Sequence, residues 1–123
     1  MKPIKALFNQ LGRSWTVSIM LQLGEEKELR YHEIREHVNA SEEGNISDAT
    51  LSKRLSDLTK LGLIKRKVIT ETPPQVTYSL TAAGEDTYNH IQTMTVWAQE
   101  MCHSGDSLDL SSSRNHKSEE VSC

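Results

Sequence analysis

Residues 50–62 carry the pattern that most limits what this chain can fold into. Leu51, Leu55 and Leu58 follow one another at helical spacing, which places them on one face of a helix. The opposite face is left polar and basic, with Ser52, Lys53, Ser56 and Lys60. Gly62 follows the pattern directly, and glycine commonly ends a helix because it adopts a positive φ without strain. The segment therefore predicts a helix that buries leucines and exposes small polar and cationic side chains.

Two strand-like segments follow this helix. Leu63–Ile69 and Gln75–Leu80 alternate in polarity as antiparallel strands do, and Thr70–Pro74 joins them. Because proline cannot donate to a strand ladder, we expect both prolines to lie in the connecting loop. A polar, cationic helix followed by a basic hairpin suits the major groove of duplex DNA and the phosphates beside it. The pattern predicts a winged helix-turn-helix, an α+β fold that is mainly α.

Two helices are expected near the N-terminus. Their apolar residues recur at helical spacing as Leu7, Leu11, Trp15, Ile19 and Leu23. We expect one helix from about Ile4 to Leu11 and another from Trp15 to Leu23. Ser14 is a suitable N-cap for the second helix, and Gly24 is expected to end it.

Three shorter segments lead to the leucine-faced helix. Leu29–Tyr31 is expected to be extended, and His32–Val38 to form a short helix. Asn39–Asn45 is polar and contains glycine, so we expect it to form the turn between the two helices. Ser47 is then placed to cap the leucine-faced helix.

A long helix is expected to begin after Thr81. Its apolar stripe consists of Tyr88, Ile91, Met94, Trp97, Ala98 and Met101. Such a stripe is more than a thin winged domain needs to cover, so we expect this helix to form a homodimer. The expected interface residues are Leu7, Leu11, Tyr88, Ile91, Met94, Ala98 and Met101. After Cys102 the composition becomes Ser-, Asp- and Glu-rich, which predicts a domain over residues 1–102 and a disordered polar tail over residues 103–123.

The charge is concentrated where the DNA-contacting elements are expected. Residues 46–81 carry six cations and three anions, a net charge of +3, although the whole chain carries −3. Residues 103–123 carry two cations and four anions, a net charge of −2. Local charge decides nucleic-acid affinity more than the total does, so the acidic balance does not exclude a DNA-binding function.

The compartment is inferred from what the sequence does not contain. No apolar run approaches the roughly 20 residues of a membrane span, and no signal-peptide pattern opens the chain. Cys102 and Cys123 both lie near the C-terminus and do not indicate a disulfide framework. We therefore expect a protein of the prokaryotic cytoplasm, without a membrane partner.

Other classes of function find less support. The five histidines and two cysteines form no compact set of metal ligands, so neither a metal nor another cofactor is expected. No nucleophile–base pair or glycine-rich phosphate loop is recognisable, and we expect no enzyme. The alternative interpretation is a winged helix that binds an acidic protein without sequence-specific DNA binding. An aromatic pocket for a small effector, near Trp15 and Trp97 at the dimer interface, is a further alternative to their packing in the core or interface.

The order of motifs resembles the HxlR-type transcriptional regulators, winged-helix relatives of the MarR regulators. The resemblance covers about Leu11 to Met101 and is most specific in the segment Pro73-Pro-Gln-Val-Thr-Tyr-Ser-Leu-Thr81. It implies a homodimer that places two recognition helices in successive major grooves of a pseudo-palindromic operator. This chain departs from the pattern at Gln75, where a basic residue is usual, and in a longer turn at Ser41–Asn45. It also lacks the N-terminal cysteine through which some members sense thiol-reactive compounds.

The expected DNA contacts lie on the leucine-faced helix, the two wing strands and the segment around Arg30 and His32. Ser52 and Lys53 point away from the leucine face, and we assign them to base edges. The remaining candidates, most of them assigned to phosphates, are Arg30, His32, Ser47, Thr50, Arg54, Arg66, Lys67 and Gln75. Lys53 and Arg54 are also consistent with an ordinary solvated helix face, and His32 with a plain exposed cap residue.

Overall fold

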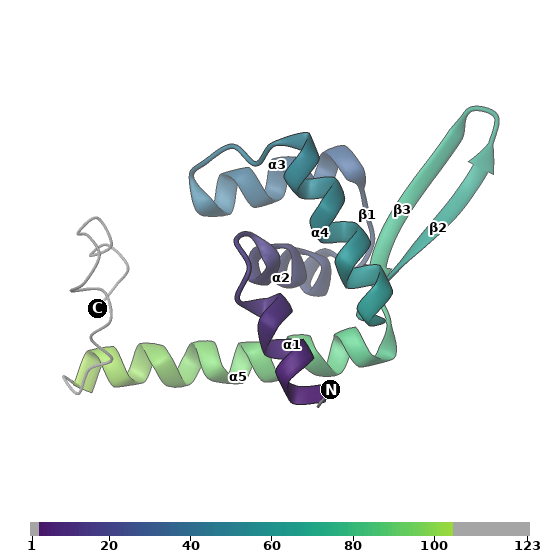
Figure 1. Ribbon diagram of the computed structural model, residues 1–123. Coiled ribbons are helices and arrows are strands. Elements are labelled where there is room, and N and C mark those ends of the chain that lie inside the picture. Colours follow the sequence, from purple (N-terminus) through teal and green to yellow (C-terminus); the bar gives the residue numbers. More distant parts are fainter. Residues whose placement is uncertain (1–2, 105–123) are drawn as a thin grey trace. The chain divides into compact units, whose positions relative to one another are not determined.

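A computed structural model describes residues 3–104 of the chain. Its elements are α1 (Pro3–Leu11), α2 (Thr16–Glu26), β1 (Leu29–Arg30), α3 (Tyr31–Glu42), α4 (Asp48–Leu61), β2 (Ile64–Glu71), β3 (Pro74–Leu80) and α5 (Ala82–Ser104) (Figure 1). The chain divides into two compact units after Tyr88, so α5 begins in the first unit and continues in the second. The order of helices and strands confirms the predicted winged helix-turn-helix.

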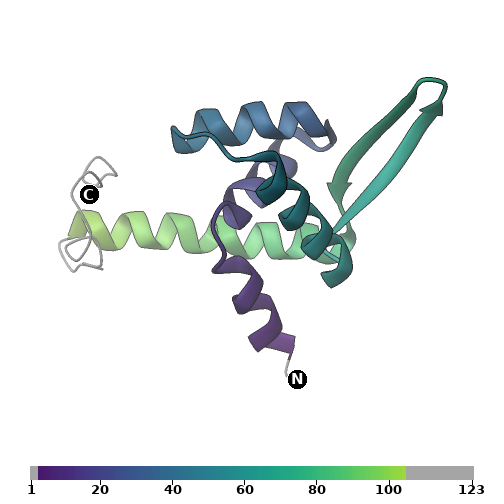
Figure 2. The same ribbon diagram turned by 45° about the horizontal axis from the view of Figure 1, so that its top comes forward.

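The sheet has three antiparallel strands in the order β1–β3–β2. Leu29 pairs with Tyr78 at the short β1 edge, and Ile64 pairs with Leu80 at the base of the long hairpin. The β2–β3 hairpin projects away from α2, α3 and α4 in both ribbon views (Figure 1, Figure 2). This hairpin is the predicted wing. Pro74, expected in the connecting loop, is instead the first residue of β3, a position where a strand tolerates the missing N–H.

The leucine face of α4 forms part of the core, as predicted. Leu51 and Leu58 are fully buried, and Leu55 is 3% exposed. They belong to a core to which α2 and α3 also contribute, with Ile19, Met20, Leu23, Ile34 and Val38. Full burial of each leucine side chain stabilises the fold by roughly 1.5–3 kcal/mol. The polar face of α4 is consequently left to solvent.

Local signals set both ends of α4 correctly. The Ser47 hydroxyl accepts a hydrogen bond from the Thr50 N–H at 3.1 Å, and Gly62 ends the helix with φ of 87°. The Thr81 hydroxyl donates to the Gly62 carbonyl at 2.6 Å and accepts from the Gly84 N–H at 3.0 Å. Thr81 therefore caps α5 and fastens its start to the end of α4.

The predicted bounds of α2 were wrong at both ends. The helix begins at Thr16, and its N-cap is Trp15, whose φ of 72° is left-handed; Ser14 makes no cap. At the other end the helix runs through Gly24 to Glu26, and Lys27 ends it with φ of 76°. Gly24 does not end the helix. It allows the Tyr88 ring to pack closely against α2, because a Cβ at this position would collide with that ring.

The turn before α4 is shorter than predicted. Residues 39–42, expected in the turn, form the last part of α3, which ends where Glu43 adopts φ of 57°. The Asn39 side chain accepts a hydrogen bond from the Ile46 N–H at 2.8 Å and so spans the connection from within the helix. This contact explains why a residue typical of turns is helical here.

α5 extends two residues beyond the predicted end of the domain. The remainder of the predicted tail, residues 105–123, lies outside the described residues. Cys102 in this helix is disulfide-bonded and so is not a free thiol, which the sequence did not indicate. Trp97 is 53% exposed, so it is not a core residue of the single chain. Over residues 3–104, none of the helices combines the length and apolar character needed to cross a membrane.

Candidate nucleic-acid interface

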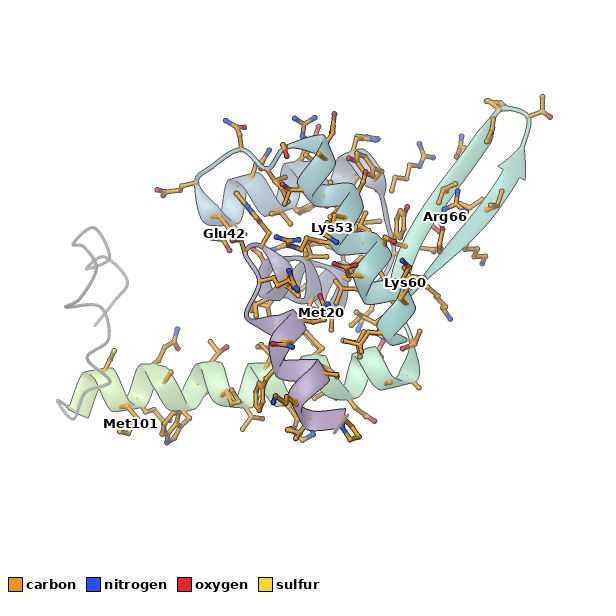
Figure 3. The ribbon with its side chains drawn as sticks, in the orientation of Figure 1. Met20, Glu42, Lys53, Lys60, Arg66 and Met101 are labelled. Carbon is orange, nitrogen blue, oxygen red and sulfur yellow. The ribbon has the colours of Figure 1, made fainter. Side chains whose placement is uncertain are left out.

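The polar face of α4 presents the predicted base-contacting residues to solvent. Ser52 is exposed, and so is Lys53, which Figure 3 labels on α4. Lys53 forms an ion pair with Asp57 one helical turn away, at 3.5 Å, and its side chain is 62% exposed. The Asp57 side chain is only 17% exposed, so Lys53 is the partner of this pair that DNA can reach.

The hydroxyl groups of Ser47 and Thr50 already form hydrogen bonds at the N-cap of α4. The Ser47 hydroxyl, which accepts from the Thr50 N–H, also donates to the Thr50 hydroxyl at 3.0 Å. The Thr50 hydroxyl proton has no acceptor in these contacts, so this group is the better phosphate donor of the two.

Arg54 has a partner that the sequence did not indicate. Its Nε donates to the Ser14 carbonyl at 2.9 Å, and the side chain is half-buried. The predicted phosphate contact would therefore have to use the terminal guanidinium nitrogens. Because Ser14 and Arg54 are 40 residues apart, no local pattern could have revealed this contact.

Arg30 and Gln75 meet beside the wing. The Arg30 Nη2 donates to the Gln75 side-chain oxygen at 2.8 Å, and the Arg30 N–H donates to Glu33 at 2.9 Å. Gln75, which stands where the family usually has a basic residue, thus holds an arginine that comes from β1. His32 is exposed in the first turn of α3. The structure therefore brings Arg30 and Gln75 together, while no hydrogen bond or ion pair among the described residues joins His32 to either of them.

A hollow of about 360 Å³ lies between α4 and the wing. Its lining residues are Tyr31, Ser52, Leu55, Ser56, Thr59, Lys60, Arg66 and Tyr78. Lys60 comes from α4 and Arg66 from β2 (Figure 3), and no carboxylate lines the hollow. Among the described residues neither cation forms an ion pair. The hollow therefore concentrates positive charge beside the exposed face of α4, while Lys67 lies exposed next to it in sequence on β2.

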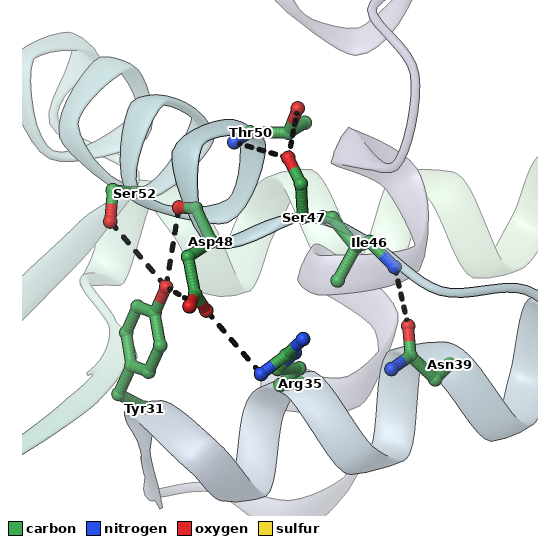
Figure 4. A network of polar contacts seen from close by, with 8 residues as sticks. All are labelled: Tyr31, Arg35, Asn39, Ile46, Ser47, Asp48, Thr50 and Ser52. Carbon is green, nitrogen blue, oxygen red and sulfur yellow. Dashed lines mark hydrogen bonds and ion pairs between the residues drawn. The ribbon is translucent and has the colours of Figure 1, made fainter.

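The sequence missed a polar network at the start of α4. The Tyr31 hydroxyl donates to the Asp48 carboxylate Oδ1 at 3.1 Å and lies 3.5 Å from the Ser52 hydroxyl (Figure 4). The guanidinium of Arg35 approaches the same carboxylate at 3.4 Å. Tyr31, Arg35 and Asp48 come from two helices, and only their tertiary placement identifies them.

The described part of the chain contains no recognisable metal site. Within residues 3–104, no group of three or more His, Cys, Asp or Glu side chains is arranged to hold a metal ion. The concentrated groups are instead hydroxyls and cations around α4 and β2, which suit an anionic, hydrogen-bonding partner.

These features define the class of winged helix-turn-helix proteins: a capped helix with an exposed polar face, and beside it a basic antiparallel wing. The chain belongs to the HxlR-like helix-turn-helix family, whose sequence pattern matches residues 10–106. It is therefore a transcriptional regulator with a helix-turn-helix DNA-binding fold.

Individual relatives agree with this assignment. The chain is 30% identical to the HTH-type transcriptional regulator YodB of Bacillus subtilis over 105 residues, 85% of this chain and 88% of YodB. It is 33% identical to YdzF, an uncharacterised HTH-type regulator of the same organism, over 77% of this chain and 83% of YdzF.

Solved structures agree as well. The reduced form of YodB matches 86% of this chain and 99% of its own, with a TM-score of 0.70 and 33% identity. A protein from Enterococcus faecalis V583, described as a MarR-family regulator, covers 82% of this chain and 86% of its own, with a TM-score of 0.71 and 25% identity.

Proposed function

We propose that the protein is a homodimer that binds a specific duplex DNA operator and thereby regulates transcription. In this proposal α4 enters the major groove and the β2–β3 wing follows the flanking backbone. The observation that carries the proposal is the hollow beside α4, where Lys60 and Arg66 have no ion-pair partner among the described residues. Unpaired cations next to an exposed polar helix attract phosphates and bring base edges within reach.

Base contacts are assigned to the exposed face of α4. Lys53 reaches guanine acceptors once it leaves Asp57, and Ser52 donates to or accepts from a neighbouring base. Backbone contacts are assigned to the surrounding residues Arg30, His32, Ser47, Thr50, Arg54, Arg66 and Lys67. Gln75 contributes through Arg30, which it holds by a hydrogen bond of 2.8 Å.

The homodimer is proposed from apolar side chains that a single chain leaves exposed. Met94 and Trp97 of α5 are 54% and 53% exposed, and Ile4 and Phe8 of α1 are 58% and 55% exposed. A second copy would cover such side chains together with the predicted interface residues Leu7, Leu11, Tyr88, Ala98 and Met101. Ile91, also predicted there, is already buried in the single chain, at 7% exposed. A two-fold dimer would read a pseudo-palindromic operator with half-sites about 10 base pairs apart.

Selection of binding sites from random duplex DNA tests this function directly. The selected duplex should bind more tightly than a scrambled duplex of the same composition, and both affinities should fall as salt rises. Equal, salt-insensitive binding to both would favour a module that binds an acidic protein. In this proposal the protein acts by occupying DNA in the cytoplasm of a prokaryotic cell, without catalysis.

A further inference from the structure

Asp48 presents a carboxylate that the protein holds by one oxygen only. Its Oδ1 accepts from the Tyr31 hydroxyl at 3.1 Å and lies 3.4 Å from the Arg35 Nη1 (Figure 4). No contact of the described residues involves its Oδ2, and the side chain is 69% exposed. The carboxylate is thus fixed in orientation while its second oxygen remains open as an acceptor.

Asp48 lies at the end of α4 where a recognition helix meets base edges. It is the first residue of α4, and recognition helices contact bases through their N-terminal residues. Ser52 lies one helical turn further along the same face, and the Tyr31 hydroxyl lies near both side chains. A helical turn rises about 5.4 Å, whereas base pairs are about 3.4 Å apart. Asp48 and Ser52 are therefore spaced to meet base pairs that are adjacent or nearly so.

A fixed carboxylate discriminates strongly among bases. Guanine and thymine present acceptors in the major groove, which repel it, and adenine has an acceptor beside its amino group. Cytosine presents a donor, its N4 amino group, and no acceptor there. An acid in the first turn also favours the helix dipole, but that effect requires neither the Tyr31 hydrogen bond nor the Arg35 cation at one oxygen.

We propose that Asp48 is a specificity-determining residue that accepts a hydrogen bond from the N4 amino group of cytosine. Tyr31 and Arg35 are positioning residues that fix the carboxylate for this contact. This inference rests on the proposed binding of α4 to duplex DNA, and it adds a base preference that Ser52 and Lys53 do not provide.

The variant Asp48→Asn tests the assignment because it replaces the acceptor Oδ2 with an amide nitrogen, which donates. Tyr31 donates a hydrogen bond and Arg35 supplies a nearby cation, so both favour the amide oxygen on their side and leave the amide nitrogen facing the groove. Affinities are measured for the selected operator and for versions with each base pair replaced in turn. At one position of each half-site the wild type should prefer cytosine to guanine by about tenfold. Asp48→Asn should abolish or invert that preference and leave the other positions unchanged.

Two further variants distinguish a base contact by Asp48 from a general effect of charge and from a loss of folding. Glu36→Gln removes one exposed carboxylate of α3 and should leave the preference at every position intact. Tyr31→Phe keeps every charge, so the salt dependence should not change, but the cytosine preference should fall several-fold because the carboxylate loses its anchor.

The outcomes distinguish this inference from the function on which it rests. A uniform gain of affinity by Asp48→Asn on all duplexes, with unchanged base preferences, would make Asp48 a repulsive charge only and overturn the inference. Wild-type binding that does not distinguish the selected duplex from the scrambled one would overturn the proposed function itself.

Discussion

The Arg54 Nε on α4 donates to the Ser14 carbonyl oxygen, 2.9 Å away, in the connection between α1 and α2. The next residue, Trp15, adopts a left-handed φ of 72°, and a Cβ at Gly44 would lie 3.3 Å from its ring. The connection from α1 to α2 is therefore hydrogen-bonded to α4, and its Trp15 ring leaves little room for a side chain at Gly44 in the turn that precedes α4. The orientation of the proposed recognition helix depends on this N-terminal connection as well as on its own leucine face.

Replacing Arg54 by lysine should distinguish the stability contributed by its hydrogen bond to Ser14 from that contributed by its positive charge. Arg54→Lys keeps the charge but removes the Nε donor, so we expect the free energy of unfolding to fall by about 1 kcal/mol. Lys60→Arg changes an exposed cation on the same helix and should leave it unchanged. Urea denaturation monitored by circular dichroism gives both values. Equal stability of Arg54→Lys and the wild type would mean that the hydrogen bond to Ser14 contributes nothing in solution.

A methyl group at Gly24 should destabilise the protein although helix propensity favours alanine. Gly24 is buried in α2, and the Tyr88 ring occupies the space that a Cβ requires. At an exposed helical position Gly→Ala stabilises by up to about 1 kcal/mol, whereas overpacking costs roughly 1–3 kcal/mol. We therefore expect Gly24→Ala to lower the melting temperature, while Gln22→Ala on the same helix changes it little. A higher melting temperature for Gly24→Ala would show that the Tyr88 ring can move away freely.

The features of the fold that the sequence predicted correctly are those with local causes. The leucine spacing of α4, its Ser47 cap and its Gly62 terminus each depend on residues within one or two helical turns. The errors depend on side-chain contacts that the local pattern does not show: the Tyr88 ring packs where a side chain at position 24 would lie, and the Asn39 side chain bonds to Ile46 across the turn.

The residues of the candidate site also fall into those that the sequence indicated and those that only the fold reveals. The cations on α4 and β2 were recognisable from the charge pattern, because each stands in a helix or strand that the sequence predicts. The Tyr31–Asp48 hydrogen bond joins residues 17 apart, and the Arg30–Gln75 hydrogen bond joins residues 45 apart. Neither pair has a local signature, so only the folded chain reveals which polar groups are anchored.

Substitutions on the exposed stripe of α5 should dissociate the proposed dimer without unfolding the chain. Met94 and Trp97 are more than half exposed in the single chain, so Trp97→Glu places its charge in water when the protein is monomeric. Ile91 is only 7% exposed, so Ile91→Glu would test folding as well as association. Gln99→Glu, on the opposite side of the helix, is the matched control. Sedimentation at tens of micromolar should give a dimer for the wild type and Gln99→Glu and a monomer for Trp97→Glu. A monomeric wild type would contradict the proposal.

Arg66 and Lys53 should affect DNA binding in different ways. Arg66 lines the hollow beside α4, where a backbone phosphate is expected, so Arg66→Ala should weaken binding to all duplexes alike. The slope of log affinity against log salt should become shallower by about 0.9 for each phosphate that the variant no longer neutralises, whereas Arg66→Lys should keep the wild-type slope. Lys53→Ala should instead remove about 1–3 kcal/mol of discrimination between the selected and scrambled duplexes. Salt titrations of the three variants against both duplexes provide the test. If Arg66→Ala reduced only the affinity for the selected duplex, Arg66 would bind a base edge and not a phosphate.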